Sequence, residues 1–108
     1  LDAIGASDLR LAVEEACRNV IEHGYPPDPP GRLRLSIAVH ADRIVVVVTD
    51  DAPRFDPDDA PEPDLTSAWQ QRRIGGLGWH LIRQVMDAVS HESPPEGGNR
   101  LILVKHLQ

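Results

Sequence analysis

Residues 44–50 read Ile44-Val45-Val46-Val47-Val48-Thr49-Asp50, an unbroken β-branched run that closes on a carboxylate. Branched side chains favour extended backbone. A continuous apolar run without polar alternation is typical of a strand buried on both faces. We therefore predict a central strand that ends at Asp50.

The segment before this run predicts a neighbouring strand. Residues 32–40 alternate between apolar and other side chains, with four aliphatic residues on one face: Leu33, Leu35, Ile37 and Val39. This alternation indicates a half-buried strand. Because only Ala41-Asp42 separates the two runs, we expect them to form a hairpin.

Two helices and two more strands are predicted around this hairpin. The first helix covers residues 7–23, with Ser7 as N-cap and Gly24 after its last turn. The second covers about residues 78–87, where apolar residues recur at helical spacing. Strands at 88–93 and 101–104 follow it. The order of elements predicts an α/β (α+β) two-layer sandwich, with a mixed, mainly antiparallel sheet and helices on one face.

Length and composition indicate one soluble globular domain, residues 1–108. The net charge of -6 argues against nucleic acid as a partner, because that would need a basic stripe. No apolar run approaches the roughly 18 residues of a membrane span. With no signal peptide visible, we expect a cytoplasmic protein. The chain starts at Leu1 without Met, which is compatible with a fragment of a larger protein.

The first helix carries a polar row at positions i, i+4 and i+8, formed by Glu15, Asn19 and His23. Residues four apart are neighbours on a helix face. An asparagine oxygen suits Mg²⁺, and a glutamate suits a general base. The alternative is an ordinary solvated helix face, and the helix alone does not separate the two interpretations.

Asp50 offers an acceptor for an exocyclic amine such as the adenine amino group, at a strand end where ligand contacts are common. The alternative is a turn aspartate, since Asp50-Asp51-Ala52-Pro53 also has the composition of a turn.

A glycine-rich stretch, Ile74-Gly75-Gly76-Leu77-Gly78, runs into the second helix. Free backbone N–H groups at a helix N-terminus bind anions, glycine lets a phosphate approach closely, and Arg73 stands just upstream. The alternative is a flexible hinge before a helix. The pattern is neither a Walker A loop nor a Rossmann fingerprint, because no Gly-Lys-Ser/Thr follows it and no strand leads into it.

Together and in order, these segments resemble the GHKL superfamily with its Bergerat ATP-binding fold, and most closely the anti-sigma-factor serine/threonine kinases. Residues 9–23 look like the N box, residues 50–57 like the G1 box and residues 73–81 like the G2 box. Three ordered motifs are far more specific than any one of them. The resemblance covers about residues 7–106.

The resemblance implies a role for each motif. Asn19 would hold Mg²⁺, Glu15 would be the general base, and Asp50 would recognise adenine. Residues 56–73 would form a lid over the ATP or ADP. The remaining nucleotide-binding positions implied are Ala52, Arg73, Gly75, Gly76, Leu77 and Gly78.

Two departures from the family pattern stand out. Ala52 replaces a usual glycine, and if that position needs a positive φ, alanine costs on the order of 1 kcal/mol. Only residues 1–6 precede the first helix, where the family usually has a strand and a helix. An open sheet edge would favour pairing with another chain, so a homodimer is a further expectation.

The implied function is an ATP-binding anti-sigma regulatory factor. It would phosphorylate a serine or threonine on an antagonist protein and sequester a sigma factor. The alternative is a non-catalytic nucleotide-binding or partner-binding module cut from a larger signalling protein.

Overall fold

The computed structural model describes residues 2–24, 31–53 and 76–107. They form two α-helices, a short π-helical segment and four strands. In chain order these are α1 (Ala3–Asn19), η1 (Val20–Gly24), β1 (Leu33–Val39), β2 (Arg43–Asp50), α2 (Gly76–Val85), β3 (Ala88–Glu92) and β4 (Asn99–His106).

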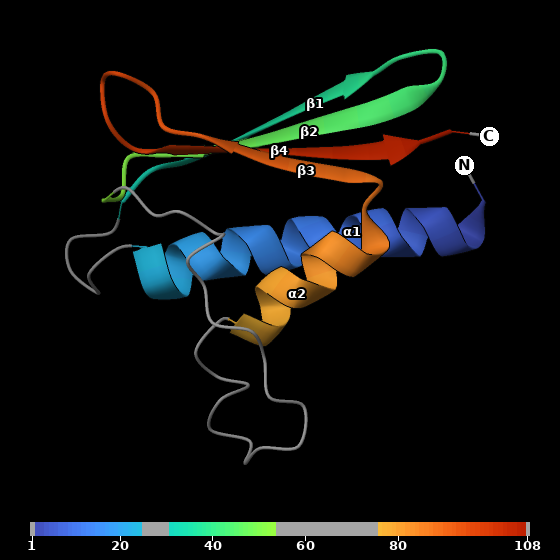
Figure 1. The fold of residues 1–108 in the computed structure, drawn as a ribbon, viewed down its shortest axis with the longest axis horizontal. Helices are drawn as coiled ribbons and strands as arrows, with labels where there is room; N and C mark the ends of the chain where they lie inside the picture. Colours follow the sequence, from blue (N-terminus) through green and yellow to red (C-terminus); the bar gives the residue numbers. More distant parts are fainter. Residues whose placement is uncertain (1, 25–30, 54–75, 108) are drawn as a thin grey trace.

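The four strands form one sheet in the order β1-β2-β4-β3, and every pairing among them is antiparallel. Figure 1 shows the sheet as one layer and α1 and α2 together as the second. The predicted two-layer α+β architecture is confirmed, and so is the β1–β2 hairpin. The parallel component of the predicted mixed sheet does not occur among the described strands.

The core lies between the two layers. It contains Ala12 and Ala16 of α1, Ile82 and Met86 in and just after α2, and aliphatic residues of the two central strands, Val46, Val48 and Leu103. Small side chains on α1 let the helix approach its neighbours closely. Ile82, Leu103, Val46 and Val48 are the largest fully buried side chains. Burying each contributes about 1.5–3 kcal/mol relative to exposure.

The first helix begins earlier than predicted. It starts at Ala3, and its N-cap is Asp2, whose carboxylate accepts a hydrogen bond from Gly5 N at 2.7 Å. Ser7 therefore lies inside the helix, and its prediction as the cap was wrong. Aspartate caps as well as serine does, and the alanines of the first turn extend the helix readily. The α-helix ends at Asn19, and η1 occupies the rest of the predicted span.

The predicted burial of the hairpin was also wrong. On β1, Leu35, Ile37 and Val39 are 44%, 59% and 71% exposed. They pair with Val48, Val46 and Ile44, so they point to the helix side of the sheet. Beyond Leu33, however, β1 projects past the two helices, whose buried contacts fall on β2 and β4. On β2 only alternate residues are fully buried, so the strand is not buried on both faces.

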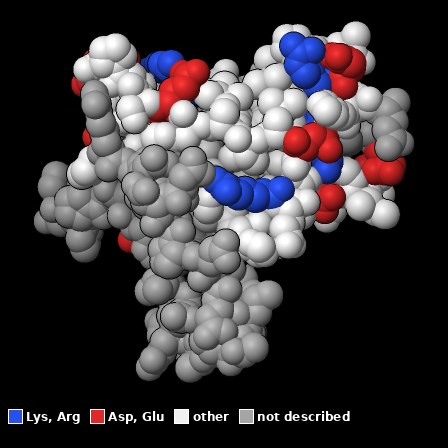
Figure 2. Space-filling model, viewed as in Figure 1, with Lys and Arg blue, Asp and Glu red and all other residues white. Residues whose placement is uncertain are grey.

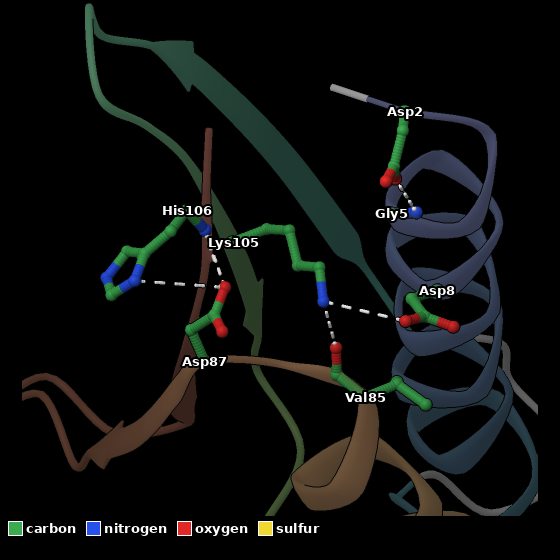
Figure 3. A network of polar contacts seen from close by, with 7 residues as sticks. All are labelled: Asp2, Gly5, Asp8, Val85, Asp87, Lys105 and His106. Carbon is green, nitrogen blue, oxygen red and sulfur yellow. Dashed lines mark hydrogen bonds and ion pairs between the residues drawn. The ribbon is translucent and has the colours of Figure 1, made fainter. Parts of the chain in front are cut away.

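One end of the two layers is tied together by polar contacts, which Figure 3 shows. Lys105 Nζ of β4 donates to the Val85 carbonyl oxygen at the end of α2 at 2.6 Å, and lies 3.6 Å from Asp8 Oδ2 of α1. The Asp87 carboxylate accepts from His106 N at 2.6 Å. We call Asp8, Val85, Asp87, Lys105 and His106 the closing cluster.

The surface of the described residues carries both signs of charge. On the face in Figure 2, basic and acidic side chains occur in small mixed groups. None of the described helices combines the length and apolar character that crossing a bilayer requires.

Candidate functional site

The N-terminal turn of α2 lies directly against the polar row of α1. A Cβ built on Gly78 would lie 2.7 Å from Glu15 Oε2 and 3.6 Å from Asn19 Oδ1. Glycine is therefore required at 78 unless the Glu15 carboxylate moves. The structure brings together three predicted site residues, Glu15, Asn19 and Gly78, from segments far apart in the sequence.

Glu15 is a sheltered carboxylate, since its side chain is 17% exposed. Among the described residues it forms an ion pair with Arg18, with Nη1 3.6 Å from Glu15 Oε1, and the Arg18 side chain is 59% exposed. Such an exposed partner neutralises little charge. Glu15 thus presents an acceptor beside the glycine turn.

Asp50 is buried at the end of β2, with 6% exposure. Its Oδ1 accepts two hydrogen bonds, from Ala52 N at 2.9 Å and from Asn99 Nδ2 at 3.0 Å. No donor among the described residues bonds to Oδ2. One oxygen is thus held by the protein, and the other remains an acceptor.

Asn99 reaches Asp50 because the two residues are directly opposite in the β2–β4 ladder. It is 8% exposed, and Nδ2 also donates to Pro53 O at 3.0 Å, with Ala52 O at 3.5 Å. Its Oδ1 lies 3.2 Å from His91 Nε2. Asp50, Ala52, His91 and Asn99 form what we call the acceptor cluster.

The turn between β3 and β4 packs against the end of β2, at Asp50. Gly97 and Gly98 have φ values of 102° and 82°, which glycine adopts readily. A Cβ on Gly98 would collide with the Asp50 carbonyl oxygen. The turn therefore abuts the end of β2 with no side chain between them.

Sequence reasoning missed Asn99, Gly98 and His91 as site residues. The predicted last strand began at 101, which left Asn99 outside it. The available signal was the glycine pair before a polar residue, but only the strand register shows that this residue faces Asp50.

Ala52 does not carry the strain anticipated for it. The described residues include no non-glycine residue with positive φ, and Ala52 is among them. Its side chain is buried, with 2% exposure, and its N–H bonds back to Asp50. Alanine is therefore accommodated without a backbone penalty.

The other predicted residues are only partly placed. Gly76 and Leu77 lie in the first turn of α2, which starts slightly before the predicted helix. A helix N-terminus presents unpaired N–H groups to an anion. Arg73, Gly75 and the predicted lid at 56–73 lie outside the described residues.

The donor set fits a magnesium ion that is held mainly by a nucleotide. Within the described parts of the chain, no group of three or more His, Cys, Asp or Glu side chains could hold a metal by itself. Mg²⁺ in phosphate-binding sites commonly takes one or two protein oxygens, phosphate oxygens and water. Asn19 Oδ1, beside the glycine turn, would be such an oxygen.

Comparison with known proteins identifies the family of this chain. The family described as histidine kinase-like ATPase domain matches residues 1–105. The serine-protein kinase RsbW of Halalkalibacterium halodurans is 38% identical over 105 residues, which are 94% of this chain and 62% of that protein. The anti-sigma F factor of Oceanobacillus iheyensis is 31% identical over 102 residues, 94% of this chain and 69% of that protein.

The fold has a solved counterpart. A mycobacterial sensor histidine kinase, MprB, superposes with a TM-score of 0.66 at 20% identity, over 93% of this chain and 70% of that one. The chain spans about three-fifths of the length of the RsbW kinase of Halalkalibacterium halodurans. From the match over nearly its whole length, this chain belongs to the histidine kinase-like ATPase domain family.

Proposed function

We propose that this chain binds ATP with Mg²⁺ and transfers the terminal phosphoryl group to a serine or threonine of an antagonist protein, as part of an anti-sigma regulatory factor. The observation that carries the proposal is the approach of Gly78 to Glu15 and Asn19. It places a glycine turn at a helix N-terminus beside a potential base and a potential metal ligand.

The nucleotide would lie between the acceptor cluster and the N-terminal turn of α2. Asp50 Oδ2 would accept from the adenine amino group, next to buried Ala52. The phosphates would meet backbone N–H groups of Gly76, Leu77 and Gly78. Arg73, Gly75 and the segment 56–73 would complete the phosphate side as a lid.

Phosphoryl transfer would use Glu15 as the base. Its carboxylate would take the proton of the substrate hydroxyl while the hydroxyl oxygen bonds to the γ-phosphorus and the bond to ADP breaks. Asn19 would hold Mg²⁺, which when bound offsets phosphate charge. The protein would mainly position groups and stabilise charge, as this reaction class requires.

The proposed partners are a sigma factor and its antagonist protein. Relatives over most of the chain are called serine-protein kinase and anti-sigma F factor. A homodimer and a cytoplasmic location belong to the same proposal. Among the described strands, β1 lies at an edge of the sheet and exposes apolar side chains, and such an edge strand tends to pair with another chain.

Binding is tested by titrating the protein with ADP and ATP, with and without Mg²⁺, while following its melting temperature. A ligand at 100 times its Kd stabilises the folded state by about 2.7 kcal/mol. We expect a Mg²⁺-dependent rise for both nucleotides. A folded sample whose melting temperature ignores both would refute the nucleotide site.

The base role is tested with Glu15→Gln, with Glu14→Gln as the matched control. Glu14 is the adjacent residue but is exposed and paired with Arg10 at 2.9 Å. We expect Glu15→Gln to keep nucleotide binding and to lose at least about 100-fold in phosphotransfer to the antagonist, in line with general-base contributions. Glu14→Gln should retain both. Full transfer by Glu15→Gln would remove Glu15 from the mechanism, and binding without transfer in the unmodified protein would identify a non-catalytic module.

A further inference from the structure

We propose that Asn99 is a positioning residue for base recognition: its amide holds the Asp50 carboxylate so that Oδ2 faces the 6-amino group of adenine. The inference rests on the proposed nucleotide site and extends it to β4, which none of the three sequence motifs includes. Asn99 would act through Asp50 and would not touch the nucleotide.

The first support is that the Asn99 amide is committed. The Asn99 residue is 8% exposed and stands directly opposite Asp50 in the β2–β4 ladder. Its Nδ2 donates to Asp50 Oδ1 and to Pro53 O, both at 3.0 Å. These two acceptors use both hydrogens of the amide group. The bond to Pro53 also ties down the chain immediately after Asp50 and Ala52.

The second support is that the amide can point only one way. His91 Nε2 lies 3.2 Å from Asn99 Oδ1, and the acceptor character of that oxygen requires a proton on Nε2. A flipped amide would set its oxygen against Asp50 Oδ1 and the carbonyl of Pro53. His91 therefore orients Asn99, and Asn99 orients Asp50.

The consequence concerns which base is accepted. With Ala52 N and Asn99 Nδ2 both on Oδ1, the plane of the Asp50 carboxylate is set and Oδ2 is left as a pure acceptor. An acceptor suits the amino group of adenine. It repels the carbonyl oxygen that guanine carries at the same ring position. Loss of Asn99 should therefore weaken recognition of the amino group more than nucleotide binding in general.

The test compares two ligands on two variants. The ligands are ADP and purine riboside 5′-diphosphate, which has hydrogen in place of the amino group. Asn99→Leu keeps the size of the side chain and removes its donors. The control, Gln84→Leu, makes the same kind of change at an exposed amide of α2, whose Nε2 lies 3.0 Å from His80 Nε2.

We expect Asn99→Leu to raise the Kd of ADP about tenfold, the effect of one hydrogen bond to a charged group. The Kd of the purine analogue should change less than about threefold, because without an amino group it gains little from a fixed Oδ2. Gln84→Leu should leave both values unchanged. Equal loss for both ligands in a folded Asn99→Leu protein would overturn the proposal, since that is the result of general disturbance.

A second variant covers the case in which Asn99→Leu does not fold. His91→Phe leaves Asn99 in place but removes the donor that orients it, and we expect a smaller loss, about twofold to fivefold, again selective for ADP. If His91→Phe binds ADP as tightly as the unmodified protein does, His91 does not orient Asn99, and the proposal is overturned. Failure of the unmodified protein to bind either ligand would instead refute the proposed nucleotide site, and this inference with it.

Discussion

The two ends of β4 carry two polar clusters whose hydrogen bonds are distributed differently. Asn99, at the start of the strand, belongs to the acceptor cluster, and Lys105, near its end, belongs to the closing cluster. Both side chains point to the helix layer. In the closing cluster, the lysine meets a helix-end carbonyl and a carboxylate, so donors and acceptors satisfy each other. In the acceptor cluster, both donors fall on one oxygen of Asp50.

The difference separates stability from binding. A cation at the C-terminus of a helix bonds to carbonyl groups that the helix leaves unpaired, so the Lys105 ammonium group is already engaged within the protein. A buried carboxylate with one oxygen that bonds to no donor of the protein contributes little to folding stability, but that oxygen can accept a hydrogen bond from a ligand. The acceptor cluster is also the more buried of the two: Asp50 and Asn99 are 6% and 8% exposed, whereas the Asp87 side chain is 37% exposed.

The largest expected effect is on Asp50. We expect Asp50→Asn to raise the Kd of ADP by roughly 10- to 150-fold, the equivalent of about 1.5–3 kcal/mol for a hydrogen bond to a charged group. Isothermal titration measures it. The matched control is Asp87→Asn in the closing cluster, which should leave the Kd within twofold. If the Kd of ADP for Asp50→Asn equals that for the unmodified protein, adenine is not bound at Asp50.

The next effect is on Lys105, the only lysine of the chain. Lys105→Met keeps the aliphatic stem and removes the ammonium group that bonds to Val85 O. We expect the free energy of unfolding to fall by about 1–3 kcal/mol, because a sheltered carbonyl loses its partner. Urea unfolding measures it. ADP affinity should stay within twofold, and a large loss of affinity would show that the two clusters are coupled.

Arg43→Met is the control for charge. Arg43 pairs with Asp42 at 2.8 Å, but that carboxylate is 75% exposed, so this variant should unfold almost as the unmodified protein does. A loss as large as that of Lys105→Met would mean that removal of any positive charge destabilises this acidic chain.

The smallest expected effect is on α1, the helix that contributes Asp8 to the closing cluster. Burial raises the pKa of the Cys17 thiol, and only the thiolate reacts with iodoacetamide. We expect the rate of Cys17 alkylation to increase with pH, and to do so at a higher pH in the folded protein than in the unfolded chain. Because the folded pKa is raised, the contribution of Cys17 to stability should decline as pH passes the unfolded pKa. At a fixed pH, the Cys17 thiol should be alkylated faster in the Lys105→Met variant than in the unmodified protein. Its rate in the Asp50→Asn variant should not rise. Mass spectrometry follows the reaction, with Cys17→Ser as the blank.

Much of the fold is local in origin and could be predicted. The β-branched run of β2, the hairpin and the two helices follow from propensity, spacing and turn residues, which act over a few positions. Glu15 and Asn19 could be placed on one helix face for the same reason. The helix cap at Asp2 was missed because Asp2 and Ser7 are both good caps, and local chemistry does not choose between them.

Local patterns in the chain were therefore enough to predict the set of elements and to name candidate site residues: Glu15, Asn19, Asp50 and the glycines at the start of α2. The tertiary structure decided which of them meet. Gly78 lies against Glu15, Asn99 bonds to Asp50, and β1 projects past the helices that were expected to cover it. Each of these depends on contacts between positions far apart in the chain. Local propensity carries no information on them, because the strand register and the helix positions arise only when the layers pack.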